Sequence, residues 1–487
     1  MGMPDWVLKH KKKGTQVTKI GKNYYLYKVT SVWDPEKKRA RKITQGYLGK
    51  ITPEGVIKPK HKRVLDEMKH VSVKEFGASQ VLYDMNADII TLLQQVFPDS
   101  WKEIFLFSAF RFLYLSPIKN LQTYYQGSFL SESLPGAHLS PKPVSSMLRD
   151  VGMFRGRVKQ VLKPLITGTE FALIDLTHVL SRSKGVVSSV PGYNSKRDFS
   201  SQIHLAFLFS LDEHMPSFFR LLPGSLRDVS SLVLTVREAG VKNAVLIGDK
   251  GFYSLDNILD LEQEGNGDLH YIFPLKRNSS LIDYTLLQQG DRQGFDGYLR
   301  FQKRVVWHYS YKIDQGDLKG KRIVVFLDER LKTEEEKDYL SRMEDSEKSK
   351  NTLEAFYELQ YRQGTIAVIT DLDASAKEVF TILKSRPEIE TMFDVFKNVL
   401  DADRTYMRDD HQMEGWMFIN FLSLVFYYRL YHVLSDHDLL KKYSPKDVLL
   451  HLSRVKKLQV KDEWITSEIP KKTRVISEKL QLPIHIT

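Results

Sequence analysis

The pattern of apolar and polar residues divides the chain into a β-rich beginning, a helical stretch and a mixed α/β remainder. Residues 1–60 alternate with a period of two, and residues 22–29 and 42–48 are predicted to form two strands around a turn at residues 33–36. From about residue 64 to 165 apolar residues recur every three to four positions. This spacing predicts helices, most clearly over residues 84–97, 102–115 and 139–148.

Two short apolar runs each lead into an aspartate. Residues 171–174 precede Asp175, and residues 244–247 are followed by Gly248 and Asp249. Such runs are typical of buried strands, whose interior normally excludes charge. Two strands that bring carboxylates to one edge of a sheet would suit a hard cation such as Mg²⁺, which binds oxygen ligands. The alternative is that each aspartate caps the turn or helix that follows it.

The elements after residue 171 follow the order strand, loop, strand, strand, helix, strand, helix. The second and third strands are predicted at residues 202–211 and 217–222. This order resembles a ribonuclease-H-like core, in which the first and fourth strands lie side by side and present their acids together. A mainly β insertion is expected next, with strands at 271–274, 297–301, 304–311 and 322–326, a charged helical stretch at 331–363, and the core resuming at 365–370.

A third acid follows the insertion. Arg386, Glu390 and Lys397 are spaced by four and seven residues, which places all three near one face of a single helix. Phe393 and Phe396 would form the adjoining apolar face. An acid between two cations suits a metal ligand with a phosphate contact on either side. The alternative is a surface ion pair between Arg386 and Glu390, which would contribute little.

Together these residues resemble the DDE transposases of bacterial or archaeal insertion sequences, specifically the insertion-sequence-4 type with a β insertion before the last acid. Asp175 in LIDLTH and Asp249 in GDKGFYS match the first two acids of that family. The Arg, Glu and Lys of its YREK signature are matched by Arg386, Glu390 and Lys397. Leu383 stands where the signature has tyrosine, so one phosphate contact is missing. Glu388 breaks the spacing to both cations, and Glu390 is therefore the predicted third acid.

The resemblance implies a DNA transposase that cuts and joins transposon ends by two-metal-ion phosphoryl transfer, in a cut-and-paste route through DNA hairpins. Its implied cofactor is Mg²⁺, with Mn²⁺ as a substitute. Its implied partners are the terminal inverted repeats and target DNA, bound by a homodimer. Asp175, Asp249 and Glu390 would be the catalytic and metal-binding residues. Two alternatives are a transposase-derived DNA-binding protein without catalysis and a ribonuclease-H-like nuclease, which would hydrolyse DNA without joining it.

Six residues are predicted to contact DNA. The resemblance implies this role for the two cations of the signature and for a tryptophan of the β insertion, on which a base freed from the stack could lie. Trp307 also fits a packing role in its strand. The predicted contacts are Arg386, Lys397, Lys250, Lys196, Arg197 and Trp307.

The charge distribution also favours DNA as the partner. The net charge is +12, yet residues 1–63 alone hold 17 Lys and Arg against 4 Asp and Glu, so the other 424 residues are close to neutral. A basic segment of this kind binds polyanions by releasing their counterions. The chain has no cysteine, which excludes disulfides, thiolate nucleophiles and sulfur-ligated zinc.

The expected fold is an α/β ribonuclease-H-like catalytic core with a mainly β insertion, preceded by a basic β-rich arm and a helical domain. The N-terminus lacks the apolar core of a signal peptide, and residues 416–433 fit a buried helix better than a membrane span. A cytoplasmic, nucleoid-associated protein is expected. The expected domains are the arm (1–63), a helical, DNA-binding domain (64–165), the first part of the core (166–264), the insertion (265–364), the second part of the core (365–435) and a C-terminal helical tail (436–487).

Overall fold

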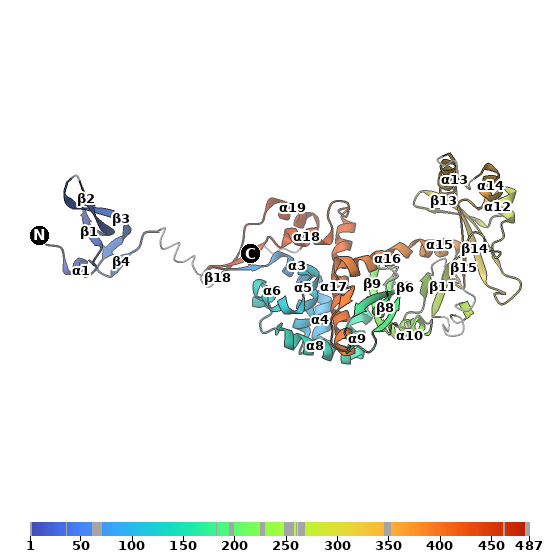
Figure 1. The fold of residues 1–487 in the computed structure, drawn as a ribbon, viewed down its shortest axis with the longest axis horizontal. Coiled ribbons are helices and arrows are strands. Elements are labelled where there is room, and N and C mark those ends of the chain that lie inside the picture. Colours follow the sequence, from blue (N-terminus) through green and yellow to red (C-terminus); the bar gives the residue numbers. More distant parts are fainter. Residues whose placement is uncertain are drawn as a thin grey trace.

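The computed structural model describes residues 2–35, 37–60, 71–181, 183–193, 199–224, 229–247, 258–259, 261, 268–344, 352–460 and 463–482. Within these ranges, eleven strands form one sheet, four strands form the sheet of the N-terminal arm, and three strands form a small sheet near the C-terminus. Figure 1 shows the large sheet between the helical region, which contains α3 to α9, and the helices α13 and α14.

The arm is an antiparallel sheet in the order β1-β2-β3-β4. The two predicted strands are confirmed as β2 and β3, and both extend further than the sequence pattern indicated. Val7, Val17, Tyr24, Leu26 and Ile51 form the small core of the arm. The elements of the arm are α1 Asp5–Leu8, β1 Thr15–Ile20, β2 Asn23–Asp34, β3 Arg39–Thr52 and β4 Gly55–Ile57.

The predicted helices of the next region are confirmed. The helices are α3 Gly77–Met85, α4 Ala87–Val96, α5 Trp101–Tyr114, η1 Ile118–Asn120, α6 Leu121–Gly127, α7 Leu130–Ser133, α8 Pro141–Met153 and α9 Arg155–Ile166. The long helix α17 (Asp410–Asp436) packs against α5 and α8. Gly152 and Gly415 allow this close approach, because a Cβ at either would lie about 2 Å from a carbonyl oxygen of the facing helix.

The helix α17 contains the expected buried segment 416–433. It is long and apolar enough to cross a membrane by length and composition alone. Most of its residues are buried among protein side chains, including Phe418, Phe421 and Leu424. The Ser423 hydroxyl donates to the Ser108 carbonyl of α5 at 2.9 Å. These contacts are those of a core helix.

The C-terminal region contains helices, as expected, and also a hairpin that the sequence analysis did not predict. Strands β17 and β18 pair with each other, and β17 also pairs with β5, which lies just before α3. This small sheet therefore links the C-terminal region to the start of the helical region. The bounds are β5 Ser72–Glu75, α18 Pro445–Leu452, β17 Lys456–Val460, β18 Glu463–Thr466 and α19 Lys471–Lys479.

The large sheet contains the strand order β9-β8-β6-β10-β11. Strands β6 and β10 are parallel neighbours, which confirms the predicted pairing of the first and fourth strands. The bounds are β6 Ala172–Ser181, β7 Val190–Tyr193, β8 Phe199–Ser210, β9 Met215–Leu222, α10 Val229–Ala239, β10 Ala244–Ile247 and β11 Leu269–Pro274. The short strand β16 (Arg404–Thr405) also pairs with β6. This order is that of a ribonuclease-H-like core.

The strands of the expected insertion continue this same sheet. The strand at 271–274, expected in the insertion, is β11, and it pairs in parallel with β10. Strand β15 then joins β11 antiparallel, and β14, β13 and β12 follow it. The bounds are α12 Thr285–Gln289, β12 Gly297–Phe301, β13 Arg304–Lys312, β14 Arg322–Asp328, α13 Glu329–Glu344, α14 Leu353–Leu359, η2 Gln360–Arg362 and β15 Thr365–Thr370.

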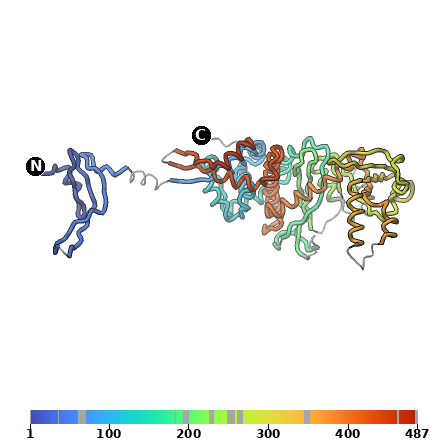
Figure 2. The backbone as a smooth tube through the Cα atoms, turned by 90° about the horizontal axis from the view of Figure 1, so that it is seen from above, coloured from blue at the N-terminus to red at the C-terminus, as the bar shows by residue number. Residues whose placement is uncertain are grey.

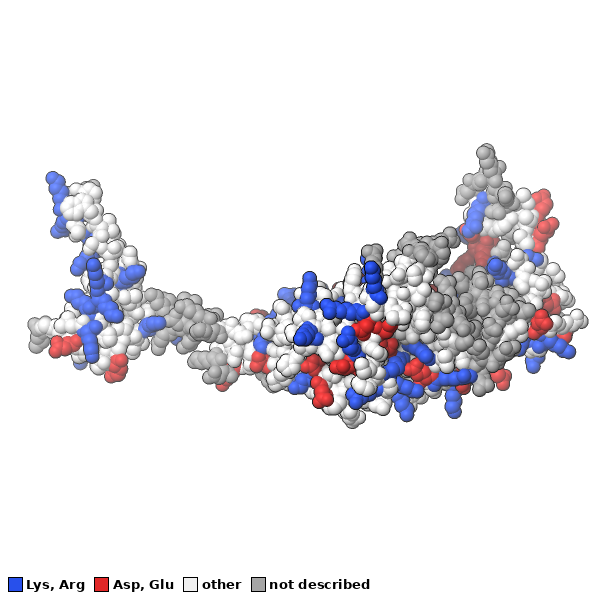
Figure 3. Space-filling model, turned by 60° about the horizontal axis from the view of Figure 1, so that its bottom comes forward, with Lys and Arg blue, Asp and Glu red and all other residues white. Residues whose placement is uncertain are grey.

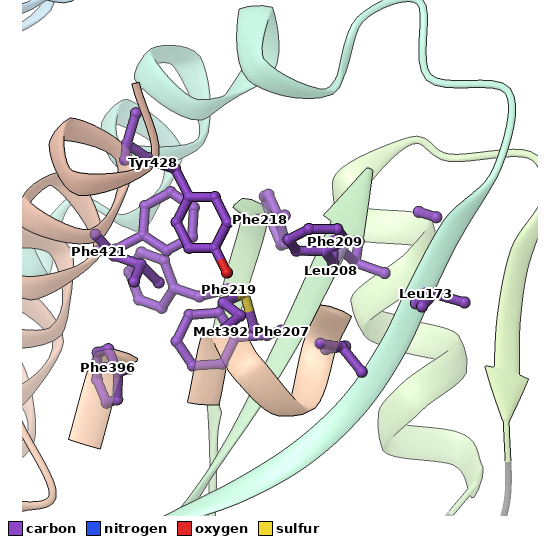
Figure 4. Close-up of a cluster of buried hydrophobic side chains, with 14 of the residues drawn as sticks. Leu173, Phe207, Leu208, Phe209, Phe218, Phe219, Met392, Phe396, Phe421 and Tyr428 are labelled. Atoms are coloured by element: carbon purple, nitrogen blue, oxygen red, sulfur yellow. The ribbon is translucent and has the colours of Figure 1, made fainter. Parts of the chain in front are cut away.

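The helices that follow β15 cover the sheet beside α17. They are α15 (Ala376–Lys384) and α16 (Arg386–Asp394), and the π-helical turn η3 (Val395–Val399) continues α16. Figure 4 shows the aromatic cluster beneath them, in which Phe207 of β8 lies near Phe396 of η3 and Phe421 of α17. The cluster fixes α16 and η3 on the face of β6 and β8.

Candidate active site

Asp175 lies in the middle of the core sheet, on β6. The three residues before it, 172–174, are almost completely buried between β8 and β10. Asp175 stands opposite Phe207 of β8 in the antiparallel ladder. Directly opposed residues project from the same face of a sheet. Asp175 therefore shares a face with Phe207, and this is the face that α16 covers.

An apolar stripe positions α16 over that face. Ile389 and Met392 are buried, and the ring of Phe393 lies 5.8 Å from that of Phe207. Phe396 of η3 packs edge-on against the same ring at 5.2 Å. Glu390 lies outside this stripe, and its side chain is exposed.

The ion pair that was the alternative to a ligand role is present in this helix. The Arg386 Nε lies 3.0 Å from the Glu390 Oε1, and the two side chains are 29% and 54% exposed. Solvent can reach Glu390, so its carboxylate is accessible to a ligand. The ion pair and a ligand role are compatible, because a carboxylate has two oxygens and several acceptor positions.

Lys397 does not lie on the same regular helix as Glu390. It belongs to the π turn η3, where the Leu400 amide donates to the Val395 carbonyl across five residues at 2.9 Å. The prediction of one uninterrupted α-helix is wrong on this point. Single π turns inside helices occur frequently at functional sites.

Asp175 lies within electrostatic range of the charged side chains of α16 and η3. The pKa of Asp175 is raised to about 6, mainly by burial and also by the negative charge of Glu390. The amide of Leu176, which donates to the Asp175 Oδ1 at 2.7 Å, and the charges of Arg386 and Lys397 lower it. Burial is the largest cause, and it disfavours the charged carboxylate. Carboxylate oxygens such as those of Asp175 and Glu390 are the ligands that a hard divalent cation takes.

Four predicted site residues lie outside the described residues. Strand β10 is described to Ile247, and its register with β6 pairs Leu246 with Ile174. The residues outside the description are Asp249, Lys250, Lys196 and Arg197. Among the residues that the structure describes, no group of three or more His, Cys, Asp or Glu side chains could hold a metal ion.

Trp307 lies on β13 and is partly buried. Its ring packs against Phe295 at 6.2 Å between centroids and against the exposed Tyr298 at 5.4 Å. The predicted packing role is therefore present. One part of the ring remains accessible, and the DNA-stacking role stays a prediction.

Glu388 makes a contact of its own, apart from the predicted acid. Its Oε2 lies 2.7 Å from the His214 Nδ1, and both line a cavity of about 410 Å³ with Tyr428 and His432. The choice of Glu390 as the third acid stays a prediction.

Sequence analysis missed Arg111, a buried cation that supports the π turn. Its Nη2 donates to the carbonyls of Leu400 and Asp401, at 2.5 and 3.3 Å, and its Nε donates to the Asn420 Oδ1 at 3.2 Å. The guanidinium lies 4.9 Å from the centre of the Trp416 ring. Burial lowers the pKa of Arg111 to about 10, although Asp401 opposes this. The signal in the sequence was one arginine within the apolar run of α5.

The strand order and the carboxylate on its central strand define a ribonuclease-H-like core with an acidic site. The sequence also matches the family described as "Transposase DDE domain" over residues 167–426, more than half of the chain. The chain therefore belongs to the DDE transposases, which act on DNA.

Two further comparisons add little. No curated protein matches the chain. One solved structure, titled as a synaptic complex of piggyBac transposase with hairpin DNA, aligns with 12% identity over 72% of this chain and 70% of that chain. Its TM-score of 0.35 is too low to support an argument.

Proposed function

We propose that the protein is an insertion-sequence-4-type transposase that excises and inserts a DNA element by Mg²⁺-dependent phosphoryl transfer. The observation that carries the proposal is the packing of α16, which carries Arg386 and Glu390, against β6, the strand that carries Asp175. These residues lie within the segment that matches the transposase domain. Asp249 follows the described end of β10 by two residues in the sequence, and β10 pairs with β6, the strand that carries Asp175.

Each residue of the site has a proposed role. Asp175, Asp249 and Glu390 would hold two divalent cations, Mg²⁺ or its substitute Mn²⁺. When bound, such ions polarise a phosphate and lower the pKa of a coordinated water or hydroxyl. Arg386 and Lys397 would contact the phosphates on either side of the scissile bond. Asp175 must lose its proton before it can bind a cation, so its raised pKa makes occupancy depend on pH.

The finer parts of the proposal concern how DNA is processed. The route is cut-and-paste with a hairpin at each excised end, and the exposed part of Trp307 would support a base freed from the stack. Two copies of the chain would hold two ends together. DNA ends and target DNA are the partners, and the excess charge of residues 1–63 supports their binding.

The test uses linear DNA that carries the ends of the element from which this gene comes, a supercoiled target plasmid, and Mg²⁺. Wild type should cleave at the ends and join them to the plasmid. Asp175→Asn, Asp249→Asn and Glu390→Gln should bind the ends nearly as well as wild type but cleave none. Calcium should support binding without turnover, because it is larger and less demanding in geometry than Mg²⁺.

Glu388→Gln is the matched control, since it removes a carboxylate from the same helix two residues before Glu390. It should remain active, because Glu388 pairs with His214. Hydrolysis without joining would point to a nuclease. Binding without cleavage by wild type in Mg²⁺ or Mn²⁺ would point to a DNA-binding protein. Full cleavage by Asp249→Asn would contradict the assignment of the site.

A further inference from the structure

The outer half of the β2–β3 hairpin is a free two-stranded ribbon. Strand β1 pairs only with residues 23–28 of β2, and β4 pairs only with residues 50–52 of β3. Among the described residues of the arm, no third strand pairs with residues 29–34 of β2 or residues 39–44 of β3. We call these two segments, with residues 35, 37 and 38 between them, the distal ribbon. Figure 2 shows it extending away from the rest of the arm.

Two irregularities separate the distal ribbon from the packed half of the hairpin. The register between β2 and β3 shifts at Leu26/Tyr27 and again at Lys28/Val29. Such bulges bend a strand and increase its twist. The inner half packs on the core of the arm through Tyr24 and Leu26. Beyond the shifts, the ribbon leaves this core.

Both faces of the distal ribbon are exposed, and they include large apolar side chains. Trp33 is 62% exposed, Val32 47% and Ile43 44%. An isolated two-stranded hairpin is only marginally stable in water. A ribbon with these side chains uncovered is therefore suited to docking on a partner rather than to standing alone.

The charge of the ribbon indicates the partner. Residues 29–44 hold five cations, Lys37, Lys38, Arg39, Arg41 and Lys42, against two carboxylates. Figure 3 shows Lys and Arg side chains on the arm, including its projecting end. A second copy of the ribbon would bring like charges together, which is unfavourable. A polyanion is the complementary partner.

The register sorts the side chains by face. Val32 pairs with Arg41, and Asp34 pairs with Arg39, so these four side chains project from one face. Thr30 and Ile43 share that face, while the other face carries Trp33 and Lys42. One face thus combines two arginines and one carboxylate with Thr30, Val32 and Ile43.

We propose that the distal ribbon enters the major groove of duplex DNA with the Arg39 and Arg41 face toward the base edges. Two paired strands are about 5 Å apart, and the major groove, about 12 Å wide, admits such a ribbon. Arginine pairs with the O6 and N7 of guanine, and Val32 and Ile43 match the methyl group of thymine. Lys37, Lys38 and Lys42 would contact the backbone phosphates. This inference rests on the proposed function, because it assigns sequence readout to the arm of a transposase.

The test compares two double variants with equal loss of charge in the full-length protein. Arg39→Ala/Arg41→Ala removes the ribbon arginines. Lys11→Ala/Lys12→Ala removes two exposed cations of the same arm outside the ribbon. Wild type is first used to select its preferred sequence from a pool of random duplexes. The affinity of each protein is then measured for that sequence and for a scrambled duplex at fixed salt.

The lysine variant should bind both duplexes more weakly by the same factor. The arginine variant should lose roughly ten- to a hundredfold more affinity for the selected duplex than for the scrambled one. Equal losses on both duplexes would overturn the proposal, as would a wild type that selects no sequence. A changed oligomeric state of the arginine variant with unchanged DNA binding would assign the ribbon to a second copy instead. Cleavage of the DNA ends, measured in parallel, separates failure of the proposed function from failure of the ribbon proposal. If wild type does not cleave, the proposed function is contradicted. If wild type cleaves and the arginine variant keeps the same sequence preference, only the role of the ribbon is contradicted.

Discussion

Asp175→Asn should make the metal-free protein more stable at pH 8 while abolishing DNA cleavage. Burial raises the pKa of Asp175 from 3.8 to about 6, so ionising this carboxyl in the folded protein is unfavourable. One pKa unit corresponds to about 1.4 kcal/mol, and the cost of the charge is therefore roughly 3 kcal/mol. Asparagine has nearly the same shape and carries no charge, so the variant avoids this cost.

The sign of the effect follows from proton binding. Between about pH 4 and pH 6 the folded protein holds the Asp175 proton more tightly than the unfolded chain does. The free energy of unfolding of wild type therefore falls as the pH rises through this window. The variant has no carboxyl at position 175, so its free energy of unfolding does not show this fall. The advantage of the variant should be small near pH 4, intermediate at pH 5 and largest above pH 7.

The assay is urea-induced unfolding of both proteins in EDTA at pH 5 and pH 8. The matched control is Asp410→Asn. Burial alone would raise the pKa of Asp410, but hydrogen bonds from Ser188 and Val187 outweigh it and lower the pKa. This control should therefore be destabilised to the same extent at pH 5 and pH 8, because the contribution of a carboxyl with a lowered pKa is lost only as the pH falls below about 4. If the stability gained by Asp175→Asn does not grow between pH 5 and pH 8, the pKa of Asp175 is not raised by burial.

Three further perturbations test other parts of the molecule. Deleting residues 1–63 should weaken DNA binding and flatten the dependence of log affinity on log salt, and an unchanged slope would assign the segment another role. Arg111→Lys should lower the cleavage rate and destabilise the protein by roughly 2–4 kcal/mol, because lysine cannot reach all the acceptors that the guanidinium group satisfies. Unchanged stability would show that these hydrogen bonds contribute little. Trp307→Ala should leave first-strand nicking intact and block hairpin formation, whereas lost stability without a selective defect would assign the ring to packing.

The order of the core elements could be predicted, because burial of one face gives each strand and helix a regular spacing of apolar residues. The run at 171–174 and the strands after it carry the apolar patterns of a sheet, and the structure confirms β6 and β10 as parallel neighbours. The pattern does not say which strand pairs with which. The strand at 271–274 was therefore expected in the insertion, although it is the next strand of the core, and β15 joins it antiparallel.

The sequence could name candidate residues for the site, but it could not give their geometry. The spacing of Arg386, Glu390 and Lys397 indicated one face, and all three affect the pKa of Asp175. The π turn was not predictable, because its end is held by hydrogen bonds from Arg111, which lies 289 positions from Leu400 in the sequence. Local propensity contains no information about such a distant partner.

The central claim is that Asp175, Asp249 and Glu390 hold the same divalent cations. Iron-directed cleavage of the backbone tests it most directly: Fe²⁺ replaces Mg²⁺ in the DNA-bound protein, and ascorbate with peroxide generates radicals at the metal. We expect cuts close to residues 175, 249 and 390, all suppressed together by excess Mg²⁺ and absent from the Asp175→Asn variant. Cuts confined to other segments, or cuts at these three places that persist in the variant, would contradict it.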